Sequence, residues 1–247
     1  MVHLEHEPAP ASSMIVPTPW LDALRVHITA VQNGGAEEDV HQLRVATRRL
    51  ASWLKLGRMR ILRSDLRWLR AAGGVVRDLD VVIALNPPAR LAAWLSGERA
   101  RHFEGLVQAL AAPRTEAILG ALSLIGPVED SRARQTIRRL ARGVLELGAE
   151  LEQAPNDIVG FHQLRRSVRG LRYALEWLHE KTGAFKDFQD VSGRAADLSV
   201  TLILLDTYPD AAALGEYRRG LDDEFLARRI DSVAAWPALR EVVAALA

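Results

Sequence analysis

Apolar residues recur every three or four positions along most of the chain, which is the spacing of one helix face. No stretch shows the alternation of apolar and polar residues that a half-buried strand requires. Glycine and proline pairs divide this pattern, and capping residues or first-turn acids mark several helix starts. We therefore predict an all-α protein. The predicted helices are 18–32, 36–56, 64–85 (capped by Ser64), two or three short ones between 89 and 124, 129–153, one capped by Asn156 or Asp157 and running to 181, 184–206, 211–230 and 237–246.

The predicted helix 36–56 carries an apolar row and a basic row. The apolar row consists of Leu43, Leu50 and Leu54. The basic row consists of His41, Arg44, Arg48 and Lys55. At about 100° per residue the centres of the two rows are roughly 130° apart. We expect the apolar row to enter a core and the basic row to line a surface or a groove.

The same arrangement returns about 120 residues later. There the basic row is His162, Arg165 and Arg169, and the apolar row is Leu164, Leu171 and Leu175. The match continues after each motif, where the aligned pairs are Arg67 and Lys186, Arg70 and Gln189, Gly74 and Gly193, and Asp78 and Asp197. The repeat predicts two related helical bundles, 14–127 and 128–247, packed as pseudo-twofold halves behind a flexible leader, 1–13.

The distribution of charge is more informative than its total. The net charge is only +1, but between His41 and Arg70 nine Lys or Arg residues accompany a single acid, Asp65. This segregation predicts one positive surface. The chain has no cysteine, and no apolar run approaches the ~20 residues of a membrane helix, so we expect a cytoplasmic protein that does not enter the membrane.

Two more basic rows have helical spacing. One consists of Arg67, Arg70 and Arg77, and the other of Arg134, Arg138 and Arg142. Like charges one turn apart cost a few tenths of a kcal/mol per pair. A bound polyanion relieves that repulsion and releases its own condensed counterions. The alternative for any single row is a solvated helix face, but duplication of the row favours a binding surface.

At this point the sequence resembles the CHAD domain family, the conserved histidine α-helical domains. The resemblance rests on His41-Gln-Leu-Arg-Val-Ala-Thr-Arg-Arg-Leu50 with Leu66-Arg-Trp-Leu69 and Gly74-Val-Val-Arg-Asp-Leu-Asp-Val81, and on His162-Gln-Leu-Arg165, Gly170-Leu-Arg-Tyr-Ala174, Phe188-Gln-Asp190 and Asp197-Leu198. It implies two four-helix bundles around a basic groove or pore. It also implies binding of inorganic polyphosphate, often on bacterial polyphosphate granules.

We therefore predict a non-enzymatic protein that needs no cofactor and whose partner is inorganic polyphosphate or another polyanion. The candidate polyphosphate-binding residues are His41, Arg44, Arg48, Arg49, Lys55, Arg67, Arg70, Arg77, Arg134, Arg138, His162, Arg165, Arg169, Arg172 and Lys186. The sequence departs from the family pattern at Ala51, Gly170 and Ala196, where basic or polar residues are common. Since two of these positions lie in the second half, we expect that half to bind less strongly.

Three alternatives remain open at this level. Nucleic acid is the main rival ligand, and tryptophans within the basic helices are the residues that would stack on bases. These tryptophans are Trp53, Trp68 and Trp177. A surface that docks an acidic protein is the second alternative. A metal-dependent phosphohydrolase is the third, with His41 and His162 meeting across the pseudo-twofold axis or with Asp78, Asp80 and Asp197 as ligands.

Overall fold

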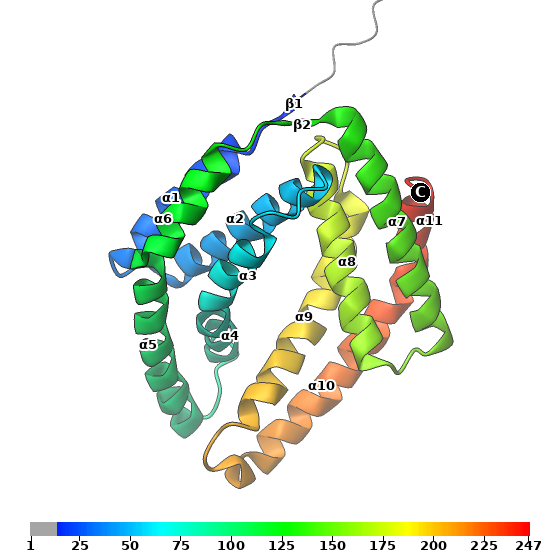
Figure 1. Cartoon of the computed structure of the whole chain (residues 1–247). Helices are drawn as coiled ribbons and strands as arrows, with labels where there is room; N and C mark the ends of the chain where they lie inside the picture. Colours follow the sequence, from blue (N-terminus) through cyan, green and yellow to red (C-terminus); the bar gives the residue numbers. More distant parts are fainter. Residues whose placement is uncertain (1–13) are drawn as a thin grey trace, which may run out of the picture.

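The computed structural model describes residues 14–247, and the predicted leader, 1–13, lies outside the described residues (Figure 1). The prediction of an all-α protein is confirmed. The helices are α1 (Thr18–Gln32), α2 (Glu37–Leu56), α3 (Arg63–Ala72), α4 (Gly74–Ile83), α5 (Ala89–Ala111), α6 (Pro113–Ser123), α7 (Asp130–Gln153), α8 (Ile158–Glu176), α9 (Gly183–Leu205), the 3₁₀ turn η1 (Ala211–Leu214), α10 (Gly215–Ala234) and α11 (Trp236–Ala244).

Two very short strands pair at one end of the molecule. Strand β1 (Met14–Ile15) runs antiparallel to β2 (Val128–Glu129), with Ile15 opposite Val128. The pair therefore joins the segment that leads into α1 to the segment that leads into α7 (Figure 1).

At the start of each motif helix an aspartate side chain accepts a hydrogen bond from a backbone N–H. Asp39 in the first turn of α2 accepts a hydrogen bond from the backbone N–H of Ala36 at 2.9 Å. Asp157, one of the two predicted caps of α8, accepts from the backbone N–H of Val159 at 2.9 Å. Such caps satisfy backbone donors that a helix leaves open at its start.

Three predicted boundaries were wrong. The helix predicted over 64–85 is two helices that meet at Gly73, and it starts at Arg63, so Ser64 is inside α3 and caps nothing. Helix α8 ends at Glu176 and not near Lys181. There the chain turns through His179 at φ 56°, and the N–H of Glu180 bonds to the carbonyl of Leu175 at 3.1 Å, which closes the helix end. The helix predicted over 211–230 is a 3₁₀ turn followed by α10.

The main hydrophobic core is shared by both halves of the chain. All six leucines of the two predicted apolar rows are at most 2% exposed and belong to this core. It extends from Leu21 and Leu24 on α1 to Trp236 on α11. A second, smaller core joins α4 and α5 to α9 and α10. The halves are thus held together by common apolar contacts.

The helices that carry the repeated motifs meet in the middle of the molecule. Helix α2 packs against α8, and α4 packs against α9, while α5 and α10 form opposite outer sides (Figure 1). Each pairing unites one helix from the first half of the chain with one from the second. Within residues 14–247 no helix combines the length and the apolar character that crossing a bilayer requires.

Candidate functional site: a basic groove between the motif helices

A groove of about 380 Å³ runs between α2, α3 and α8. Six of its ten lining residues are basic, and none of the described residues that line it is acidic. We call it the basic groove. Its residues are Arg44, Arg48, Ala51, Ser52 and Lys55 on α2, Arg70 on α3, and Arg166, Arg169, Gly170 and Tyr173 on α8. Five of the predicted binding residues therefore come together here, from both motifs.

Arg48 lies among the guanidinium groups of this groove. Burial lowers the pKa of Arg44, and the neighbouring charge of Arg48 lowers it further, to about 10. Burial, and after it the charge of Arg48, lowers the pKa of Arg169 to about 9. The same two causes lower the pKa of Arg70. These groups remain charged at neutral pH in surroundings that disfavour the charge. No ion pair joins Arg48 itself to a carboxylate within residues 14–247.

Two glycines allow the groove arginines to lie against the neighbouring helices. A Cβ on Gly74 would lie 3.1 Å from Nη1 of Arg44, and the same guanidinium nitrogen donates to the carbonyl of Arg70 at 3.1 Å. In the second half, a Cβ on Gly193 would lie 3.8 Å from Nη2 of Arg165. The pair Gly73 and Gly74 therefore both ends α3 and provides the surface on which Arg44 packs.

One aspartate lies close to each of these two arginines, Asp78 to Arg44 and Asp197 to Arg165. Burial raises the pKa of Asp78, and Arg44 is the charge that most opposes the rise. Burial likewise raises the pKa of Asp197, opposed first by Arg165. Asp78 follows Gly74 by about one helical turn, and Asp197 follows Gly193 by the same spacing. The two halves of the sequence repeat therefore place a glycine, an arginine and an aspartate in similar local arrangements.

The motif histidines lie beside the basic cluster. Burial lowers the pKa of His41, and the charge of Arg77 lowers it further. Burial and the charge of Arg165 do the same for His162, whose Nε2 lies 3.1 Å from the hydroxyl of Ser199 on α9. Among residues 14–247 no group of three or more His, Asp or Glu side chains is placed to hold a metal.

Several predicted residues have carboxylate partners outside the groove. Arg49 and Arg172 both contact Glu176, with N–O distances of 2.5 and 3.5 Å. Arg77 pairs with Glu37 on α2. The structure thus assigns these three arginines an ion-pairing contact that the sequence did not reveal. Asp80, considered above as a metal ligand, pairs with Arg99.

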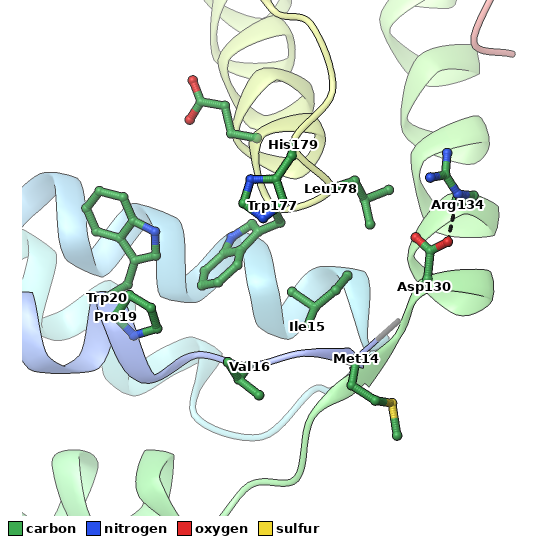
Figure 2. Close-up of a pocket in the computed structure, with 11 residues that line it drawn as sticks. Met14, Ile15, Val16, Pro19, Trp20, Asp130, Arg134, Trp177, Leu178 and His179 are labelled. Carbon is green, nitrogen blue, oxygen red and sulfur yellow. Dashed lines mark hydrogen bonds and ion pairs between the residues drawn. The ribbon is translucent and has the colours of Figure 1, made fainter. Parts of the chain in front are cut away.

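The predicted row on α7 also lies away from the groove. Arg134 pairs with Asp130 and Glu180, both at 2.9 Å. Figure 2 shows Arg134 at the edge of a separate pocket of about 360 Å³ that is lined by Trp20, Trp177 and the first described residues of the chain. Arg138 lines another depression, beside α8 and the C-terminus. Of the remaining predicted residues, Arg67 is exposed next to Arg70, and Lys186 is exposed on α9.

The aromatic residues of the basic helices are engaged in packing. Trp53 is fully buried and donates to the carbonyl of Ile15 at 3.0 Å, and Trp177 donates to that of Arg49 at 3.1 Å. Trp68 is covered by the guanidinium of Arg114, 4.4 Å from the ring centroid. Tyr173, which lines the groove, is only 5% exposed. The groove therefore lacks an exposed aromatic face among the residues described.

Sequence analysis missed one cation of the groove and two beside it. Arg166 lines the groove, and its position three residues before Arg169 was a signal that it shares that face. The charges of Arg63 and Arg139 act on Lys55, which lies at the groove. Nothing local in the sequence connects Arg139 on α7 with the end of α2, because the two helices come together only on folding.

Comparisons with known proteins agree on the fold. The CHAD domain profile matches residues 19–206. The crystal structure of the CHAD domain from the plant Ricinus communis superposes with a TM-score of 0.76 at 24% identity, covering 100% of this chain and 98% of that one. PptA from Streptomyces chartreusis gives a TM-score of 0.62 at 19% identity, covering 90% and 99% of the two chains. No curated protein matches the chain.

Proposed function

The chain belongs to the CHAD domain family, and from this premise we propose that its basic groove binds inorganic polyphosphate without hydrolysing it. The observation that carries the proposal is the set of six cations, drawn from both motif helices and α3, that line one groove together with no described acidic residue. A polyanion neutralises these charges together and releases its condensed counterions. Association with polyphosphate granules in the cytoplasm follows as part of the same proposal.

The packing of the aromatic residues favours polyphosphate over nucleic acid. A protein that binds single strands without sequence preference stacks bases on aromatic rings, at about 1–3 kcal/mol per base. Tyr173 is 5% exposed, and the tryptophans of the basic helices pack against backbone or arginine. The groove thus offers charge without a stacking surface, which suits a ligand made of phosphate alone.

The test is a calorimetric titration of the purified protein with long-chain polyphosphate at several salt concentrations. We expect the Arg44→Ala/Arg48→Ala variant to lose more affinity than Arg165→Ala/Arg169→Ala, because both arginines of the first pair line the groove and Arg165 does not. A charged hydrogen bond contributes about 1.5–3 kcal/mol, so each lost contact weakens binding about tenfold to a hundredfold. Equal losses would contradict the asymmetry, and affinity independent of salt would contradict the electrostatic mechanism.

Two further measurements separate this function from its rivals. In competition at fixed salt, polyphosphate should displace single-stranded or duplex DNA from the protein, and the reverse result would favour a nucleic-acid-binding module. Incubation with polyphosphate should release no phosphate. Steady release that a substitution at Asp78 or Asp197 abolishes would instead establish a phosphohydrolase.

A further inference from the structure

The far end of the basic groove lies where three helices meet. Arg44 and Lys55 are eleven residues apart on α2, so the groove extends about 16 Å at ~1.5 Å per residue. Helix α7 crosses the end of α2 at Lys55. The hydroxyl of Thr136 on α7 donates to the carbonyl of Leu56 at 3.1 Å, a buried contact that holds the two helices together.

Two more arginines lie beyond Lys55 at this junction. Arg139 is exposed and follows Thr136 by about one turn of α7, while Arg63 is the first residue of α3. Both are close enough to Lys55 that their charges, after burial, lower the pKa of its ammonium group. The positive surface of the groove therefore continues over α3 and α7.

Their neighbours have structural roles that these two lack. Arg58 donates to the side chain of Gln135 at 3.3 Å, and Arg132 donates to the carbonyl of Gly57 at 3.5 Å. Within residues 14–247, neither Arg63 nor Arg139 forms an ion pair, and Nε of Arg63 is buried without a hydrogen-bond partner. Their charges are thus available to a ligand.

The opposite end of the groove carries carboxylates among its arginines. There Asp78 on α4 lies close to Arg44, and Asp197 on α9 lies close enough to Asp78 that the two carboxylates repel each other. A polyanion longer than the groove meets carboxylates as well as arginines beyond Arg44, whereas the charges that act on Lys55 come from arginines alone. The end at Lys55 is thus the more favourable exit for a polyanion.

We propose that Arg63 and Arg139 form an exit track that carries a long polyphosphate chain out of the basic groove past Lys55, and so make affinity depend on chain length. This inference rests on the proposed function. Tripolyphosphate has ten oxygen atoms, which occupy roughly 300 Å³ at about 30 Å³ per water-sized atom. It fits within the 380 Å³ of the groove and does not need the track, whereas a long chain extends beyond the groove.

The experiment compares tripolyphosphate and long-chain polyphosphate on the wild type and on Arg63→Ala/Arg139→Ala. Working at about 150 mM salt screens charges more than ~8 Å from the ligand. The matched control is Arg90→Ala/Arg219→Ala, which removes the same charge from exposed arginines of α5 and α10. Arg139→Gln is a milder single variant, because Arg139 is exposed and bonds to no described side chain.

For long-chain polyphosphate we expect the track variant to bind at least about tenfold more weakly, with a salt slope shallower by about 1.5, from two lost contacts. Arg139→Gln should show about half that change in slope. Tripolyphosphate should bind both variants as it binds the wild type, and the control should behave as the wild type does with both ligands.

Equal weakening for both ligands, no weakening for either, or the same loss in the control would overturn the exit track while leaving polyphosphate binding intact. Failure of the wild type to bind either ligand would instead overturn the proposed function, and the track with it.

Discussion

Arg48 and Arg49 are adjacent on α2, and the structure predicts that removing their charges changes stability in opposite directions. Arg48 lies among other guanidinium groups in the basic groove, whereas Arg49 pairs with Glu176. Methionine is a suitable substitute at both positions, because it keeps an unbranched apolar stem and removes only the charged head.

The Arg48→Met change removes repulsion with Arg44, Arg70 and Arg169. At a few tenths of a kcal/mol for each like-charged neighbour, the free protein gains about 1 kcal/mol. In a domain of this size that raises Tm by about 2–4 °C. The same change removes a phosphate contact, so the affinity for polyphosphate should fall about tenfold to a hundredfold.

The Arg49→Met change breaks an ion pair whose two side chains are 18% and 21% exposed. It also removes a guanidinium that stacks 4.1 Å from the ring centroid of Trp20 and 5.0 Å from that of Tyr173. Among the described residues, Glu176 is then left with only the more distant Arg172, and this change together with the lost stacking should cost about 2 kcal/mol or more. Tm should therefore fall by at least about 4 °C, with a smaller loss of polyphosphate affinity than Arg48→Met causes.

Thermal unfolding at low salt and at 1 M salt, with calorimetric titration of polyphosphate, measures all of these quantities. The gain from Arg48→Met should shrink at 1 M salt, where the Debye length is only about 3 Å. A lower Tm for Arg48→Met at low salt would refute the reasoning, because it would show that Arg48 makes a stabilising contact in the free protein.

Two more predictions concern the aspartates, histidines and glycines that lie next to the arginines of the motif helices. Affinity for polyphosphate should increase as the pH is lowered, because burial raises the pKa of Asp78 and of Asp197 above the ordinary aspartate range, so that these carboxylates lose their negative charge before exposed ones do. Protonation of the motif histidines, whose pKa burial lowers, adds positive charge in the same direction. Asp78→Asn should strengthen binding at pH 8 and flatten this dependence in titrations carried into the acidic range; an affinity that is constant or falls as the pH is lowered would contradict it. Gly74→Ala should weaken binding severalfold, because the new Cβ displaces the Arg44 guanidinium, whereas Gly193→Ala should have little effect. Equal titration curves for the two glycine variants would show that the position of this guanidinium does not matter.

Much of the fold follows from local sequence. The leucine rows are periodic over whole helices, so the buried face of α2 and α8 is determined before any tertiary contact forms. The end of α8 is different. It depends on a left-handed turn at His179, a residue with no strong preference for that conformation, so the helix was predicted to run several residues too far.

The sequence predicted which face of a helix carries the candidate binding residues, but not which side chains pair with each of them. Periodicity placed Arg44 and Arg48 on one surface correctly, but it could not show that Arg49, one residue on, meets Glu176 on α8. Likewise, the charge of Arg134 is spaced as if for a ligand, yet it pairs with Glu180, which the sequence places 46 residues away. Ion pairs between distant segments form only when the helices pack together, so the spacing of residues along one helix cannot predict them.

The position of the groove between α2 and α8 has a consequence for how the site can change. In a symmetric homodimer, a site on the twofold axis receives every substitution twice, because the same residue forms both walls. Here the two walls belong to one chain and have already diverged, since Arg70 lines the groove while Gln189 is its aligned counterpart in the second half. One wall can therefore acquire a new side chain while the other keeps its own, so the ligand preference can drift in single steps that no homodimer allows.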